Sequence, residues 1–153
     1  MVLLPTWMKQ GGVDDWAPLL SMRRAVVVDA VATACAVCTD RELRDLDTLS
    51  QALMVEADSE VLTRGTLEFI RQVFRIAKNL PAELWFNTVA EVVQADEQVR
   101  DCMFADVAVV QGYFPAIVAL LRARDVGHAR SAARSMLEQW DAQTVAGLTR
   151  SLV

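Results

Sequence analysis

Apolar residues recur along the chain three and four positions apart, which is the spacing of helices that bury one face. We expect six or seven helices and no strand, so the predicted fold class is all-α, an antiparallel helical bundle. Residues 1–13 are predicted to form an extended lead and residues 14–153 a single helical domain. The predicted helices cover residues 20–37, about 40–56, 59 to about 78, 81 to about 94, 101–124 and about 126–147.

Polar residues interrupt this pattern where helices are expected to begin and end. Thr39 is a candidate N-cap, and Glu42 follows it at the spacing of a capping box. Pro81 suits the first turn of a helix. The polar stretch 95–101 is predicted to be either a loop or an exposed helix start. Pro115 predicts a kink in the helix over 101–124, because proline removes a backbone donor.

The composition fits one compact domain with a substantial core. Hydrophobic residues make up 54% of the 153 residues and charged residues 23%, with only six glycines and four prolines. These figures exclude a disordered chain and disfavour a fold rich in tight turns. The net charge of −5 makes this chain alone a poor ligand for a nucleic acid.

The cysteine count and the hydropathy pattern suggest a cytoplasmic protein with no membrane contact. The chain has three cysteines, an odd number, and no signal peptide is visible. No apolar run reaches the roughly 20 residues that a membrane span needs.

Motifs for catalysis are weak, and we expect no enzyme and no catalytic residues. Cys35 and Cys38 form a CxxC pair, but no second pair completes a zinc site, so both are interpreted as small core residues. His128, the only histidine, is interpreted as an exposed residue at a helix start. Neither a glycine-rich phosphate loop nor a nucleophile elbow is present.

Arg23 and Arg24 are the more informative charged residues. They lie inside the first long apolar helix, so one of them is expected to point inward. An inward arginine needs an anionic partner. That partner is either a structural acid such as Asp29 or the acid group of a ligand, and the sequence leaves both open.

The order of several motifs resembles the C-terminal effector-binding and dimerisation domain, the FCD domain, of GntR-type transcription regulators of the FadR subfamily. The lead resembles the linker that enters this domain, and the last helix pair is similar in the run Leu121–Asp125 followed by Ala129, Ala132 and Leu137. The other motifs are the Leu-x-x-x-Arg-Arg pattern at Leu19–Arg24, the helix start Thr39–Leu43, and the helix over Phe69–Asn79.

Many members of this family hold a metal ion in the bundle centre with one Asp and three His. The resemblance places those four positions on Thr66, Ile70, Phe114 and Met136, none of which is a usual ligand for zinc, nickel or manganese. We therefore expect no metal and no cofactor.

These replacements make the bundle centre apolar, which suits a hydrophobic or amphipathic effector. Some relatives bind acyl-CoA without a metal, and the resemblance permits a small organic acid or acyl compound here. Arg23 is expected to pair with the acid group of the effector, and Tyr113 is a possible polar contact. The apolar part of the predicted ligand-binding site is lined by Thr66, Ile70, Phe114 and Met136.

FadR-type regulators also carry a winged helix that reads DNA, and nothing in this sequence matches one. We expect a homodimer that reaches DNA only through such a domain, and the lead favours a piece of a longer regulator over a stand-alone effector domain. The alternative function is a helical dimerisation or interaction domain with a filled core and no ligand. Candidates for its exposed apolar face are Trp7, Trp16, Trp85 and Trp140, although the sequence favours buried positions for them.

Overall fold

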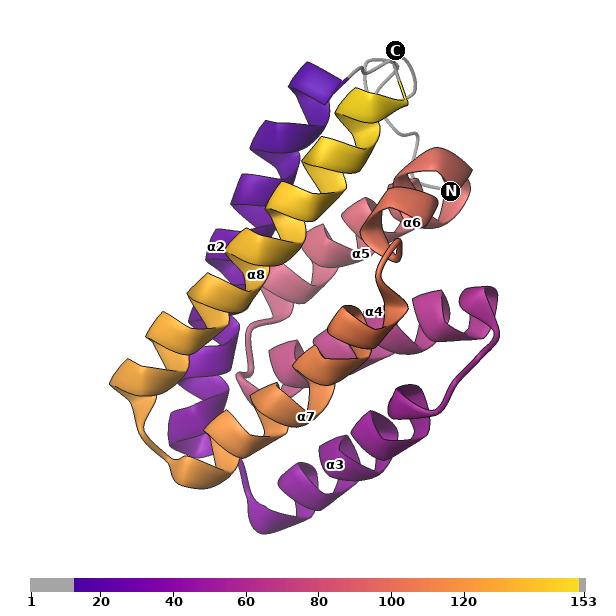
Figure 1. Cartoon of the computed structure of the whole chain (residues 1–153). Helices are drawn as coiled ribbons and strands as arrows, with labels where there is room; N and C mark the ends of the chain where they lie inside the picture. The colour runs from indigo at the N-terminus through magenta and orange to yellow at the C-terminus, as the bar shows by residue number, and fades with distance from the viewer. Residues whose placement is uncertain (1–12, 152–153) are drawn as a thin grey trace.

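The computed structural model describes residues 13–151, and within that range it contains seven helices and no strand (Figure 1). This confirms the predicted all-α bundle. In chain order the helices are α2 (Val13–Val37), α3 (Asp40–Met54), α4 (Ser59–Ile76), α5 (Leu80–Ala95), α6 (Glu97–Met103), α7 (Val107–Ala123) and α8 (Val126–Arg150). Residues 1–12, which include most of the predicted lead and Gly11-Gly12, lie outside the described range.

Side-chain caps begin most of the helices, as the sequence suggested. Thr39 and Glu42 form a reciprocal capping box at the start of α3, with Thr39 N–H donating to Glu42 over 2.8 Å. Asp58, Asp96, Asp106 and Asp125 each accept backbone N–H bonds at the starts of α4, α6, α7 and α8. Each cap satisfies donors that have no partner inside the helix.

Two predicted boundaries are wrong. The helix predicted over 101–124 is two helices, because the chain breaks after Met103 and Asp106 caps a new helix from Val107. The uncertain stretch 95–101 mostly belongs to the short helix α6, which begins behind its own cap, Asp96. The first helix begins at Val13, seven residues or about two turns before the periodic stretch that starts at residue 20.

The long helices α2 and α8 run side by side, α4 and α7 pack against α2, and α3 packs on α4 and α7 (Figure 1). The core between them is continuous, and its largest fully buried side chains are the rings of Phe69, Phe74, Phe86 and Phe114. The centre of the bundle receives side chains from α2, α4, α7 and α8, and Phe86 adds one from α5.

No single helix among the described residues is long and apolar enough to cross a membrane. Helices α6 and α7 reach that length and composition only together, and the pair is bent by 69° at the break between them.

Candidate functional site

Two small cavities lie in the centre of the bundle, and they share the side chains of Ile70 and Trp140. The first has a volume of about 20 Å³ and the second about 10 Å³. Each has room for roughly one water molecule. The bundle centre is therefore nearly filled in this conformation.

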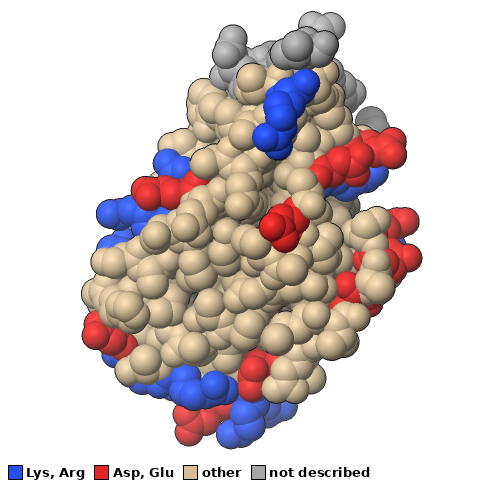
Figure 2. Space-filling model, viewed as in Figure 1, with Lys and Arg blue, Asp and Glu red and all other residues tan. Residues whose placement is uncertain are grey.

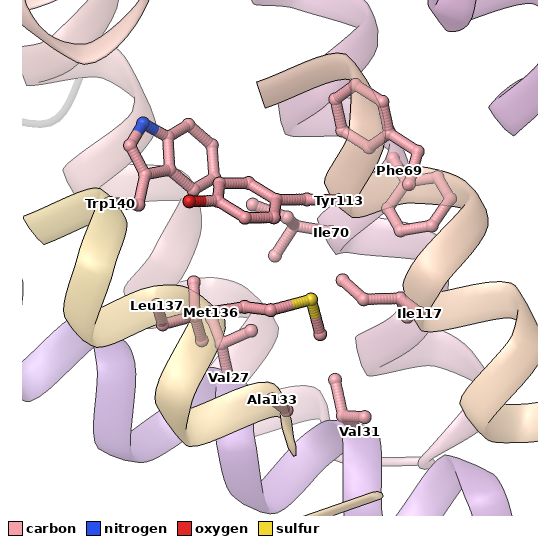
Figure 3. Close-up of a pocket in the computed structure, with 11 residues that line it drawn as sticks. Val27, Val31, Phe69, Ile70, Tyr113, Ile117, Ala133, Met136, Leu137 and Trp140 are labelled. Atoms are coloured by element: carbon pink, nitrogen blue, oxygen red, sulfur yellow. The ribbon is translucent and has the colours of Figure 1, made fainter. Parts of the chain in front are cut away.

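The first cavity is apolar and lies between α2, α4, α7 and α8. Figure 3 shows the thioether of Met136 extending from α8 toward Ile117 on α7, while the rings of Tyr113 and Trp140 lie together at one end. The Phe69 and Phe114 rings pack with their centroids 5.1 Å apart. Methionine adapts its shape readily, so Met136 is the lining side chain best able to move for a ligand.

The second cavity is bordered by a buried charge cluster. Arg23 is only 2% exposed, and its Nη2 atom donates to Asp141 Oδ1 over 2.7 Å. Arg24 donates to the other oxygen, Asp141 Oδ2, over 2.8 Å. The Arg23 guanidinium also lies over the Trp140 ring, 5.0 Å from its centroid, at the distance of a cation–π contact.

This cluster carries two positive charges and one negative charge; Arg23 and Asp141 are buried, whereas Arg24 is partly exposed. Burial lowers the pKa of Arg23 and raises the pKa of Asp141, while the attraction between the charges opposes both shifts. Arg23 Nε has no hydrogen-bond partner among the described residues. A buried donor without a partner is costly, and an anion accepting from Nε would remove that cost.

The structural acid that pairs with Arg23 is Asp141, not Asp29. Asp29 lies on the surface, where it pairs with Arg130 over 3.2 Å. The sequence contains a signal for the correct partner: Leu137, Trp140, Asp141, Thr144 and Leu148 follow one buried helical stripe, so Asp141 is an acid on an apolar face. A buried acid and a buried arginine in one bundle are expected to form an ion pair, because a buried charge without a partner is strongly destabilising.

The predicted site residues all reach the bundle centre, but they divide between the two cavities. Ile70, Tyr113, Phe114 and Met136 line the first cavity, and Arg23, Thr66 and Ile70 line the second. The Tyr113 hydroxyl is buried without a hydrogen-bond partner in the part of the chain that the structure describes, and burial raises the pKa of that phenol. Trp140, for which the sequence favoured a buried position over an exposed one, is buried and lines both cavities.

The four positions that the resemblance assigned to a metal site do not fit a metal ion. Their side chains offer two hydrocarbon groups, one thioether and one hydroxyl, and the Thr66 hydroxyl is already donated to the Leu62 carbonyl over 2.7 Å. Zinc, nickel and manganese require imidazole, thiolate or carboxylate ligands. No step of a mechanism is therefore assigned to a metal.

The cysteine pair, the histidine, Trp16 and Trp85 lie outside the two cavities. Cys35 and Cys38 are buried in the core at the end of α2, as expected, and burial raises the pKa of both thiols. His128 is exposed in the first turn of α8, as expected. Trp16 is buried, Trp85 is half-buried, and Trp7 lies outside the described residues.

The fold and the site define a helical bundle whose buried centre combines a guanidinium with an apolar lining. A family model described as the FCD domain matches residues 18–139, and the chain belongs to that family. FCD domains are the C-terminal effector-binding domains of GntR-type regulators, a regulatory family and not an enzyme family. A search of curated proteins and a search of solved structures each found no match.

Proposed function

We propose that this chain is the effector-binding and dimerisation domain of a FadR-type regulator whose effector is a small organic acid or acyl compound. The observation that carries the proposal is Arg23, a buried arginine with an unpartnered Nε atom at the border of an apolar centre. The effector's acid group accepts from Arg23 Nε, and its apolar part lies beside Ile70, which lines both cavities. The site works without a metal.

Because the two cavities hold about one water molecule each, binding requires the centre to open. A ligand that binds only the open form shifts the population toward it. That shift changes the relative positions of α2 and α8, and in a dimer it changes the spacing of attached DNA-binding domains. Contact with DNA is made only through such a winged-helix domain, and contact with a membrane is not part of the function.

The dimer is proposed to form through the outer face of α7. Figure 2 shows that charged side chains lie mainly around the edge of the visible face, whose middle is largely uncharged. Ala108, Gly112 and Ala119 are exposed on one side of α7, a helix that Figure 1 labels in the same view. A large uncharged surface is typical of protein interfaces.

The effector proposal is tested by thermal unfolding of the purified chain with a panel of short carboxylic acids and acyl-CoA compounds. A binding acid raises the stability by about 2.7 kcal/mol at a concentration of 100 Kd, and the shift keeps growing with the logarithm of the acid concentration. Arg23→Lys keeps the charge but loses Nε, so we expect weaker binding in a folded protein. Light scattering on the same samples is expected to give the mass of a dimer.

The second candidate function is a dimerisation domain with a filled core and no ligand, favoured by the small volume of both cavities. If no compound in the panel shifts the unfolding temperature and the protein is still a dimer, this second function replaces the first.

A further inference from the structure

A larger hollow lies on the surface, between the first turns of α4 and the short helix α6, with a volume of about 550 Å³. This volume is in the range of small-molecule sites. The hollow and the inner cavity beside Arg23 share two residues, Thr63 and Phe104. These two side chains therefore stand between the hollow and the buried cavity.

Phe104 is well placed to move. It follows the last residue of α6, in the break before α7, and it is only partly buried. Its ring packs edge-on against Trp140, with the centroids 6.0 Å apart. Trp140 itself is fixed, because its Nε1 atom donates to the Met103 carbonyl over 2.7 Å. A rotation of the Phe104 side chain would join the hollow to the inner cavity and leave Trp140 in place.

The outer hollow and the inner cavity are the two ends of the path that a rotation of Phe104 would open, and these ends carry opposite charges. Glu60, Glu97, Asp101 and Arg100 line the outer hollow, so its net charge is negative. Glu97 and Asp101 have no ion-pair partner among the described residues, whereas Glu60 pairs with Arg64. At the inner end, the cluster of Arg23, Arg24 and Asp141 is positive overall, with Arg23 Nε unpartnered.

Helix α4 runs along the path and sets its length. Glu60 lines the hollow, Thr63 lines both spaces, and Thr66 lines the inner cavity. At a rise of 1.5 Å per residue, Glu60 and Thr66 are about 9 Å apart along the helix axis. The Thr63 hydroxyl donates to the Ser59 carbonyl over 2.8 Å, so it offers only an acceptor to a ligand.

We propose that the ligand of this site is a zwitterion whose carboxylate and ammonium groups are separated by a short apolar chain, an ω-amino acid. The carboxylate accepts from Arg23 Nε, and the ammonium remains near Glu97 and Asp101 in the outer hollow, which is the mouth of the path. A simple fatty acid would leave the acidic mouth unpartnered, and a dicarboxylate would place a second negative charge there. This inference rests on the proposed function, because it requires an acid to bind at Arg23.

The test compares three matched probes, 6-aminohexanoate, hexanoate and hexylamine, by calorimetric titration of the purified chain. We expect 6-aminohexanoate to bind at least about tenfold more tightly than either probe that lacks one charge, since each charged hydrogen bond contributes independently. Among 4-aminobutanoate, 6-aminohexanoate and 8-aminooctanoate, we expect the middle length to bind best.

Variants at the mouth separate the two proposals. In Glu97→Gln/Asp101→Asn the advantage of 6-aminohexanoate over hexanoate is expected to disappear, while hexanoate binds as well as before or better. Both residues are exposed, so the variant is expected to fold. The control, Asp29→Asn/Glu138→Gln, makes the same change in net charge away from the hollow and is expected to keep the advantage.

If hexanoate and 6-aminohexanoate bind equally to the unaltered chain, the zwitterion inference is wrong and the effector proposal stands. If hexylamine binds as tightly as 6-aminohexanoate, the acid end is not recognised and the inference is likewise overturned. If none of the three probes and no acid of the panel binds, both proposals fail.

Discussion

The Trp140 ring contacts two residues that each carry a buried polar atom without a partner. The Arg23 guanidinium lies 5.0 Å from the centroid of the ring, and the centroid of the Tyr113 ring lies 5.7 Å away. Arg23 Nε and the Tyr113 hydroxyl are two of only three such buried polar atoms among the described residues. Unpartnered buried groups destabilise a fold, so their concentration around one residue at the cavities supports a ligand-binding role.

Tyr113 is the only tyrosine, so the titration of its buried hydroxyl can be measured directly. Burial penalises the phenolate and the charge of Asp106 adds to this effect, so its pKa is raised above the ordinary value near 10. An alkaline titration followed by phenolate absorbance is expected to show a transition above pH 10 in the native protein. Tyr113→Phe is expected to remove the transition. A native transition at or below pH 10 would show that the hydroxyl reaches solvent.

The same shift predicts how stability depends on pH. Because the folded-state pKa is raised, the contribution of Tyr113 to stability is complete below its ordinary pKa and is lost as pH rises through the folded-state value. Tyr113→Phe should therefore lose less stability above pH 10 than the unaltered chain.

At the scale of the helices, the approach of α3 and α4 depends on one glycine. A Cβ atom at Gly65 would overlap Leu53 Cδ2, and Leu53 is buried in the core. Gly112 in α7 lies in open space, with no atom within 4 Å of where its Cβ would be. The two glycines share a helical conformation and differ in their surroundings.

At a concentration where the chain is monomeric, Gly112→Ala is expected to stabilise the fold by about 0.5–1 kcal/mol, because alanine favours the helix and the new methyl group meets no atom of its own chain. Gly65→Ala has the same gain but also the overlap with Leu53, which costs about 1–3 kcal/mol in a packed core. Urea unfolding measures both, and the difference between the variants isolates the cost of the overlap. Equal stability of the two variants would mean that α3 moves away without cost.

At the scale of the whole molecule, the ion cluster joins α2 to α8, the two longest helices, near the cavities. Asp141→Asn leaves Arg23 and Arg24 without a countercharge, and we expect a loss of about 3–5 kcal/mol in the free energy of unfolding. Asp29→Asn removes an exposed ion pair between the same two helices and should cost about 0–1 kcal/mol. Similar losses in both variants would show that the Arg23–Asp141 pair is solvated in solution.

Most of the secondary structure could be predicted because helix starts are local. Thr39 and Glu42 are three residues apart, and their capping box needs no distant partner. The break between α6 and α7 was missed because the segment on both sides is apolar, and continuous hydrophobicity hides a turn. Its only local signal is Asp106, one aspartate before an apolar run.

The sequence by itself determined the helical class, the family and the inward position of one arginine of the Arg23–Arg24 pair, because periodicity, motif order and charged residues inside an apolar helix are readable along the chain. Only the tertiary structure decided which acid meets that arginine. Asp29 is six residues from Arg23 and Asp141 is 118 residues away, yet the packing of α2 against α8 buries Asp141 and exposes Asp29. Packing likewise decided that the centre is nearly filled and that Thr63 and Phe104 separate the inner cavity from an acidic hollow, since cavities depend on side chains from distant helices.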